Sequence, residues 1–181
     1  MTHAVAHGPD PVTDVDAYLA SLRDALGSRD PLVVLREMPS ELRHAIDGLS
    51  TEALNTAEAP GKWSIRDVIQ HLADSELVGG YRFRMILAHD RPTLAGYDQD
   101  LWAIRLRYAE ADVPTALEDF TRLRQANLRL FERASPADRE RVGIHTERGE
   151  ESIAQLIPTY AGHDIVHLRQ IARIRRAVAA S

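Results

Sequence analysis

The sequence of 181 residues contains no cysteine. This absence excludes disulfide bonds, thiolate zinc sites and a cysteine nucleophile, so any bound metal would need histidine or carboxylate ligands. No apolar run approaches the roughly 20 residues that a membrane-spanning helix requires, and the first residues lack the basic-then-apolar pattern of a secretory signal. We therefore expect a cytoplasmic protein with no membrane partner.

An excess of positive charge is also missing, since the formal net charge is −5 at pH 7. An acidic balance argues against a general nucleic-acid binder, which needs a basic surface. The segment RQIARIRR at 169–176 is a basic run that could form such a patch. Its arginines are expected around the exposed side of a helix. We therefore predict a small-molecule partner and no nucleic-acid partner.

Regular alternation of apolar and polar residues, the pattern of a half-buried strand, is also absent over any real length. Apolar residues recur instead at helical spacing. This spacing predicts helices over 14–26, 30–48, 64–89, 98–109, 113–134 and 152–178.

The four longer helices predict an all-α fold, a four-helix bundle. The long 91–113 connection, which carries the short extra helix, permits an up-down-down-up order. We expect a tail at 1–13 and a single domain at 14–181.

Local signals refine this pattern. Ser64 followed by Asp67 resembles a capping box and predicts the start of the second long helix. Pro39 lies inside the first long helix and predicts a kink or a break there. The polar, turn-rich segment 135–152 predicts a loop, and we interpret His145 within it as a solvated loop residue.

The histidines form the most informative pattern. His163 and His167 lie four residues apart, so a helix would present both imidazoles on one face. His3 and His7 have the same spacing, but they fall in the predicted tail, where no scaffold would hold both rings. His71 lies at the border of the apolar stripe of the second long helix. A bundle could bring it opposite the pair on the last helix.

Three imidazole nitrogens from two helices would make an open divalent metal site. Asp74 and Asp164 could orient the rings or serve as extra ligands. The alternative is an ordinary helix-border His71 and a partly solvated pair on the last helix. Spacing alone leaves both interpretations open.

A resemblance to a known family rests on four segments: GKWSIRDVIQHLADSE, YRFRMIL, GYDQDLWA and GHDIVHLRQIARI. In order and spacing they resemble the DinB/YfiT-like superfamily, over about residues 28–178. The resemblance implies a four-helix bundle, usually a homodimer, that holds a divalent metal. It places the metal ligands at His71, His163 and His167, with nickel or zinc as the expected metal and manganese or iron as further candidates.

Two enzyme functions follow from such a site. Metal-bound water would act as the nucleophile in a hydrolase. Alternatively, an external low-molecular-weight thiol would coordinate the metal, as the resemblance implies for thiol S-transferases, and no side chain is assigned as catalytic. A non-enzymatic, stress-linked metal-binding scaffold is the alternative from a different class.

Arg82 and Trp102 are the candidate substrate-binding residues. A guanidinium binds carboxylates through a bidentate fork, and an aromatic ring can form the wall of a pocket. Ion pairing within the bundle is the alternative for Arg82, and core packing is the alternative for Trp102.

Overall fold

The computed structural model describes residues 13–179. The tail predicted at 1–13, with His3 and His7, therefore lies outside the described residues except for residue 13. In chain order the elements are α1 (Val15–Leu26), α2 (Pro31–Ile46), α3 (Thr51–Asn55), α4 (Ile65–Ala88), β1 (Thr93–Leu94), α5 (Gln99–Arg105), the 3-10 helix η1 (Tyr108–Glu110), α6 (Val113–Arg133), α7 (Pro136–Arg139), β2 (Val142–His145), β3 (Gly149–Ser152) and α8 (Ile153–Ala179).

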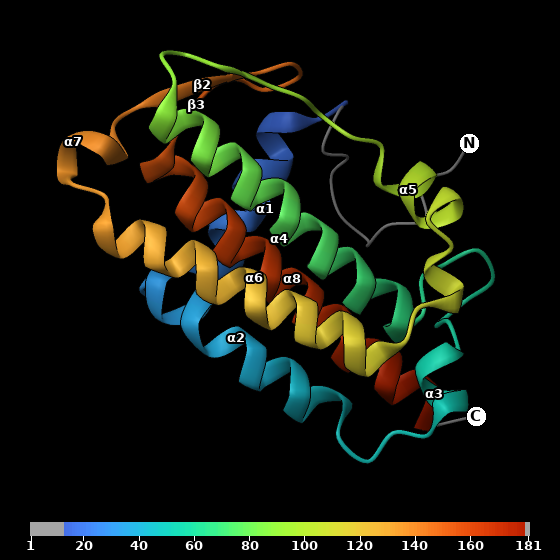
Figure 1. Cartoon of the computed structure of the whole chain (residues 1–181). Coiled ribbons are helices and arrows are strands. Elements are labelled where there is room, and N and C mark those ends of the chain that lie inside the picture. Colours follow the sequence, from blue (N-terminus) through green and yellow to red (C-terminus); the bar gives the residue numbers. More distant parts are fainter. Residues whose placement is uncertain (1–12, 180–181) are drawn as a thin grey trace.

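Helices α2, α4, α6 and α8 form a four-helix bundle in which α4 and α6 run in the direction opposite to α2 and α8 (Figure 1). The predicted up-down-down-up order is confirmed. Because α4 and α6 are parallel neighbours, the chain must return along the whole bundle between them. The crossover at 89–112 makes this return and carries β1, α5 and η1.

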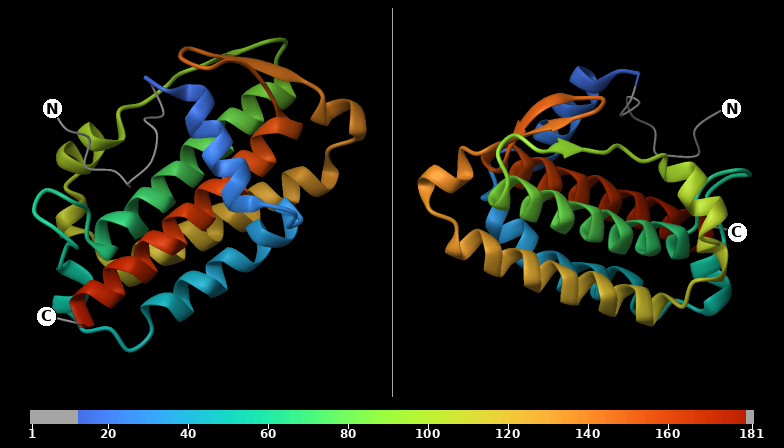
Figure 2. Two further views of the ribbon diagram at one scale, coloured as in Figure 1. Left: turned by 180° about the vertical axis from the view of Figure 1, so that it is seen from behind. Right: turned by 45° about the horizontal axis from the view of Figure 1, so that its top comes forward.

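The remaining elements cover one side of the bundle. Figure 2 (right) shows α1, the β-hairpin and the crossover over α4 and α8, on the side away from α2 and α6. Helices α4 and α8 are therefore enclosed between two layers.

The apolar stripe of α4 lies in the core. The side chains predicted to be buried there, Ile65, Val68, Ile69 and Leu72, are each at most 1% exposed. Burying an aliphatic side chain of this size stabilises a fold by about 1.5–3 kcal/mol. This packing fixes the rotation of α4 about its axis and hence the direction of its polar side chains.

The predicted capping box at the start of α4 is confirmed. Ser64 Oγ accepts a hydrogen bond from the Asp67 backbone N–H, and the Asp67 carboxylate accepts one from the Ser64 backbone N–H at 2.9 Å. Gly79 and Gly80 do not interrupt the helix. A Cβ on Gly79 would lie 2.6 Å from the ring of Tyr160, so this glycine allows α8 to approach closely.

Of the kink or break predicted at Pro39, the break does not occur, because α2 continues from Pro31 to Ile46. Proline lacks the N–H that would donate to the carbonyl four residues earlier, which is that of Leu35. The guanidinium of Arg124 donates to this carbonyl instead, at 3.0 Å. A side chain from α6 thus supplies the missing donor and the helix remains intact.

The prediction of a loop over 135–152 is also wrong. This segment contains α7 and a hairpin of β2 and β3, and β1 pairs with β2 in parallel to complete a small sheet of order β1-β2-β3. The strands are two to four residues long. Such short strands leave too little alternation for a sequence pattern to reveal.

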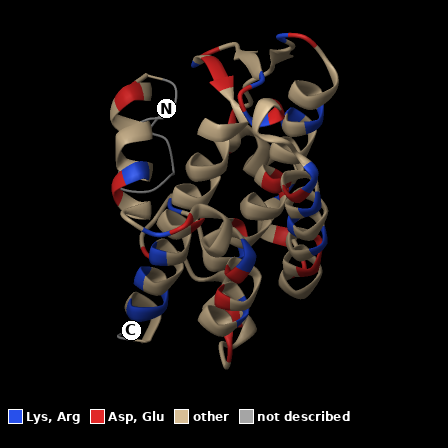
Figure 3. Ribbon diagram, turned by 90° about the vertical axis from the view of Figure 1, so that its left-hand side faces the viewer, with Lys and Arg blue, Asp and Glu red and all other residues tan. Residues whose placement is uncertain are grey.

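Charged residues of both signs are distributed over the helices, and basic residues gather in the last turns of α8 (Figure 3). Several of these arginines already have partners within the chain: Arg173 forms an ion pair with Glu58 at 2.6 Å, and Arg175 donates to the carbonyl of Ala45. Among residues 13–179, no helix combines the length and apolarity needed to cross a membrane.

Candidate metal centre

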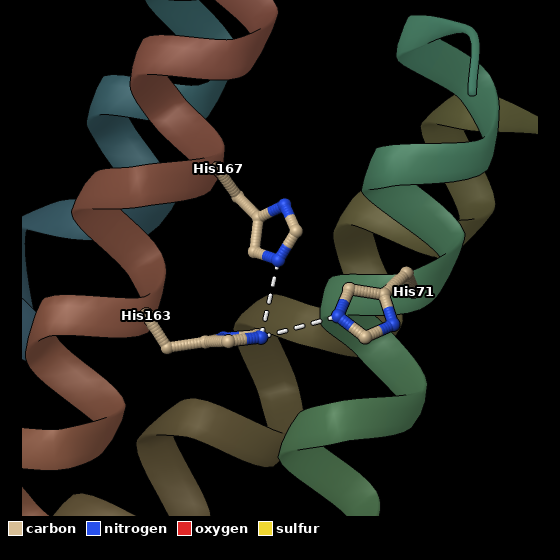
Figure 4. A group of neighbouring side chains, drawn as sticks. All are labelled: His71, His163 and His167. Carbon is tan, nitrogen blue, oxygen red and sulfur yellow. Dashed lines mark hydrogen bonds between the residues drawn. The ribbon is translucent and has the colours of Figure 1, made fainter. Parts of the chain in front are cut away.

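Three imidazoles meet between α4 and α8. Nε2 of His163 lies 3.1 Å from Nε2 of His71 and 3.1 Å from Nε2 of His167. The three nitrogen atoms all lie within 4.8 Å of one another. Figure 4 shows the ring of His71 approaching from α4 and the other two rings from successive turns of α8.

Hydrogen bonds alone cannot satisfy this cluster. A neutral imidazole carries one N–H, so His163 Nε2 can donate to only one of its two neighbours. In addition, Nδ1 of His71 and Nδ1 of His163 are buried and have no hydrogen-bond partner among the described residues. A buried polar atom without a partner costs about 1–3 kcal/mol.

The donor set fits a divalent cation. Two imidazole nitrogens that share an ion at about 2.1 Å lie about 3.0–3.4 Å apart when the angle between the bonds is about 90–110°. The two measured separations of 3.1 Å agree with this range. One cation would satisfy all three Nε2 atoms, which is more than any pattern of hydrogen bonds among them can do.

Gln170 determines which nitrogen of His167 carries the proton. Nδ1 of His167 lies 2.8 Å from Oε1 of Gln170, and a carbonyl oxygen only accepts, so Nδ1 carries the proton and donates it in this hydrogen bond. The Nε2 lone pair is then directed toward the other two rings. The sequence reasoning did not identify Gln170, although a polar residue three positions after a helical ligand lies within its reach.

The three rings are neutral at pH 7. Burial lowers the pKa of His71 and that of His163 well below the ordinary value; repulsion from His167 lowers both further, and His71 also lowers that of His163. Burial also lowers the pKa of His167 to about 4, although the hydrogen bond with Gln170 opposes this shift. Neutral rings can bind a metal without first losing a proton.

Trp63, which immediately precedes the α4 capping box, covers one side of the cluster. Its ring centroid lies 4.9 Å from that of His71 and 6.4 Å from that of His167, and its side chain is buried. An indole in this position excludes water from one side of the imidazoles. Sequence reasoning did not assign this role to Trp63.

The two carboxylates that could have assisted the histidines have other partners. The Asp74 carboxylate accepts a hydrogen bond from the Tyr108 hydroxyl at 2.6 Å, and that of Asp164 pairs with Arg124 at 2.6 Å. Among the described residues, only the three imidazoles make up the cluster of candidate metal ligands. A cation held there would have three protein ligands from residues 13–179, and water or substrate would fill its remaining coordination positions.

A cavity of about 330 Å³ adjoins the cluster and reaches His163. It is lined by residues from α1, α4, the crossover, the hairpin and α8, among them Tyr18, Ser75, Arg82, Tyr97, His145 and Tyr160. Its size lies at the lower end of the range for small-molecule sites. The histidine cluster is therefore beside a space that could hold a small substrate.

Of the two candidate substrate-binding residues, Arg82 lines the cavity and Trp102 does not. Arg82 is 5% exposed. Trp102 lies on α5 and packs against Tyr97 with ring centroids 4.5 Å apart, so it supports the cavity wall from behind. Arg84, about three and a half helical turns beyond His71, donates to the side-chain oxygen of Asn127 and holds α4 to α6.

The interpretation of His145 as a solvated loop residue is wrong. His145 ends β2, lines the cavity and is only 2% exposed. Its Nδ1 accepts hydrogen bonds from the backbone N–H groups of Glu147 and Arg148 in the following turn. The residue is buried because β1 and β3 flank it, and this arrangement depends on a strand pairing that the local sequence does not reveal.

Fold and geometry define a four-helix bundle with a three-histidine cluster beside a cavity, in which His71 and His167 are buried and His163 is half-buried. A model of the DinB superfamily matches residues 35–171, and the chain belongs to this superfamily. The family resemblance found in the sequence is thereby confirmed.

Individual relatives agree with this assignment. The chain is 30% identical to a protein of Bacillus mycoides over 141 residues, covering 78% of this chain and 81% of the relative. It is 33% identical to a protein of Bacillus licheniformis over 145 residues, covering 78% and 81% respectively. Both relatives are named as candidate metal-dependent hydrolases.

A solved structure shares the fold. YfiT from Bacillus subtilis, described as a probable metal-dependent hydrolase with an unusual four-helix bundle topology, matches with a TM-score of 0.75 and 22% identity. The match covers 94% of this chain and 92% of YfiT.

Proposed function

We propose that this protein is a metal-dependent enzyme that hydrolyses a small-molecule substrate at the three-histidine cluster. The observation that carries the proposal is the convergence of three neutral imidazole nitrogens beside a cavity. The names of the relatives from Bacillus mycoides and Bacillus licheniformis, both candidate metal-dependent hydrolases, support the same class.

In this proposal His71, His163 and His167 hold the cation. Gln170 orients His167 through Nδ1, and Trp63 keeps water from one side of the rings. A divalent cation supplies Lewis acidity and lowers the pKa of coordinated water toward neutrality. The cavity beside His163 positions the substrate.

The donor set favours particular metals. Imidazole nitrogen suits zinc, nickel and iron, whereas manganese prefers carboxylate oxygen. Because Asp74 and Asp164 are bound to Tyr108 and Arg124, the cluster offers nitrogen only. We therefore propose nickel or zinc, with iron next and manganese last.

A thiol-dependent transferase is the second candidate. The chain has no cysteine of its own, and both acidic residues that line the cavity, Asp98 and Glu147, are exposed. A buried carboxylate base for activating water is thus missing from the described cavity lining. An external low-molecular-weight thiol would bring its own nucleophile, which is the observation that favours this candidate.

We also propose a homodimer. The crossover exposes three apolar side chains, Leu101, Ile104 and Leu106, which are 47%, 73% and 57% exposed. A group of exposed aliphatic side chains on one short segment is typical of a contact surface. Light scattering during size-exclusion chromatography tests this: a mass near twice 20.2 kDa supports the dimer, and a mass near 20.2 kDa contradicts it.

The test of function is a pair of substrate panels. Tag-free protein loaded with nickel or zinc is assayed against esters, amides and lactones, and separately against low-molecular-weight thiols combined with electrophiles. Turnover in the first panel that is lost in His71→Ala supports the hydrolase, and turnover in the second panel alone supports the transferase. His89→Ala, a change at the exposed histidine that ends α4, is the control. Stoichiometric metal without turnover in either panel contradicts an enzyme and favours the scaffold.

A further inference from the structure

Among residues 13–179, two arginines are buried, and their surroundings differ. Arg124 forms ion pairs with Glu76 at 2.7 Å and with Asp164 at 2.6 Å. Arg82 is 5% exposed and forms no ion pair with any described carboxylate; its Nη2 donates to the carbonyl of Ala95 at 2.6 Å. Burying a charge without a counter-ion is costly, and proteins accept this cost where a ligand supplies the opposite charge.

Arg82 also retains an unused donor. Its Nε is buried and has no hydrogen-bond partner among the described residues. The guanidinium lines the cavity beside Tyr160, whose pKa is raised by burial and lowered in turn by Arg82.

A second unused donor lies in the same cavity. Because Nδ1 of His145 accepts hydrogen bonds from the backbone N–H groups of Glu147 and Arg148, the proton of the neutral ring must be on Nε2. This Nε2 is buried and lacks a partner in the described part of the chain. The two backbone N–H groups of the hairpin turn therefore leave Nε2 of His145 as the hydrogen-bond donor of this ring.

The other charged groups of the cavity do not neutralise Arg82. Arg148 lines the cavity and is paired with Glu151 at 2.6 Å and 2.9 Å. Asp98 and Glu147 lie at the exposed edge, where solvent screens their charge. The buried end of the cavity is thus positive and rich in donors.

We propose that the cavity binds a small molecule through an oxyanion, a carboxylate or a phosphate, which Arg82 and His145 hold. The inference rests on the proposed function insofar as this molecule is the substrate of the histidine cluster. On α4, Arg82 lies about three helical turns beyond His71, which corresponds to about 16 Å along the axis. The oxyanion at Arg82 and the group that reaches the histidine cluster are therefore different parts of the same small molecule.

Calorimetric titration of the full-length protein tests the inference with three matched probes: hexanoate, hexyl phosphate and the neutral hexanamide. We expect hexanoate or hexyl phosphate to bind at least 10-fold more tightly than hexanamide, and the stronger of the two identifies the oxyanion. Equal affinity for all three probes, or no binding, overturns the inference. This comparison uses only wild-type protein.

Variants then locate the oxyanion. Arg82→Gln is expected to weaken binding of the anion about 10- to 100-fold, the loss that follows removal of charge-assisted hydrogen bonds, and to leave hexanamide unchanged. Arg84→Gln, on the same helix but bonded to Asn127, is the control and keeps wild-type affinity. Unchanged anion affinity in Arg82→Gln overturns the inference.

His71→Ala separates this inference from the proposed function. His71 belongs to the cluster but does not line the cavity. Loss of metal with retained anion binding supports the oxyanion site whether or not the metal is catalytic. Loss of anion binding in His71→Ala together with normal binding in Arg82→Gln places the anion on the metal; that result overturns the inference and leaves the proposed function standing.

Discussion

Oε1 of Gln170 lies 2.8 Å from Nδ1 of His167, one helical turn away on α8. This contact fixes the tautomer of His167, because the oxygen can only accept the proton. It also restrains the rotation of the ring, so that Nε2 stays directed toward His163. Partners of this kind commonly set the affinity of a histidine ligand for its metal.

The contact predicts the effect of removing Gln170. Gln170→Leu is expected to weaken binding of zinc or nickel about 10- to 100-fold, as measured by competition with a chelating dye. Gln155→Leu, the same substitution nearer the start of α8, serves as the control because the side chain of Gln155 accepts from the Ser152 backbone N–H and does not contact the histidine cluster. Wild-type metal affinity in Gln170→Leu would show that the contact has no role in ligation.

The lowered pKa values predict how metal binding depends on pH. The pKa of His167 is about 4 and burial lowers the pKa values of His71 and His163 well below the ordinary value, so a decrease from pH 7.0 to 5.5 protonates these rings far less than ordinary histidines. Protons therefore compete little, and metal affinity should change less than about threefold between pH 7.0 and 5.5. Three rings with an ordinary pKa near 6.5 would each be about 90% protonated at pH 5.5, and affinity would fall about 10-fold for each ring. A fall of that size contradicts the described burial.

The buried ion network around Arg124 predicts a large loss of stability. Arg124→Leu leaves the carboxylates of Glu76 and Asp164 buried without their cation. We expect a decrease of about 3–5 kcal/mol in the free energy of unfolding by urea. Arg122→Leu, which removes an exposed ion pair with Glu118 on the same helix, should cost less than about 1 kcal/mol. Similar values for the two variants would contradict this account of the core.

Gly162 predicts a steric effect between α1 and α8. A Cβ at this position would lie 2.3 Å from the backbone oxygen of Leu22, which cannot move without shifting α1. Gly162→Ala is therefore expected to destabilise the protein by about 1–3 kcal/mol, although alanine is favoured over glycine in a helix by about 1 kcal/mol. Urea unfolding measures the difference, and a more stable variant would refute the close approach of the two helices.

The helical framework could be predicted because its signals are local. The capping box of Ser64 and Asp67, the apolar stripe of α4 and the four-residue spacing of His163 and His167 all act within a few residues. The resemblance to the superfamily then related His71 to the pair on the last helix. The structure then shows the three rings together between α4 and α8.

The missed features all depend on contacts between distant parts of the chain. Pro39 is accommodated because Arg124, on another helix, donates to the carbonyl of Leu35. His145 is buried because β1, about 50 residues earlier, pairs with its strand. No local pattern around Pro39 or His145 carries this information, so propensity alone predicted a kink or a break in the helix and an exposed loop.

The central claim, that three histidines share one cation, is tested most directly by elemental analysis. Tag-free protein is equilibrated with nickel or zinc, freed of excess metal by gel filtration and compared with His71→Ala, His163→Ala, His167→Ala and the control His89→Ala. The account predicts about one ion per chain in the wild type and in the control, and almost none in the three cluster variants. A wild type without metal, or a His71→Ala variant that keeps a full equivalent, would contradict it.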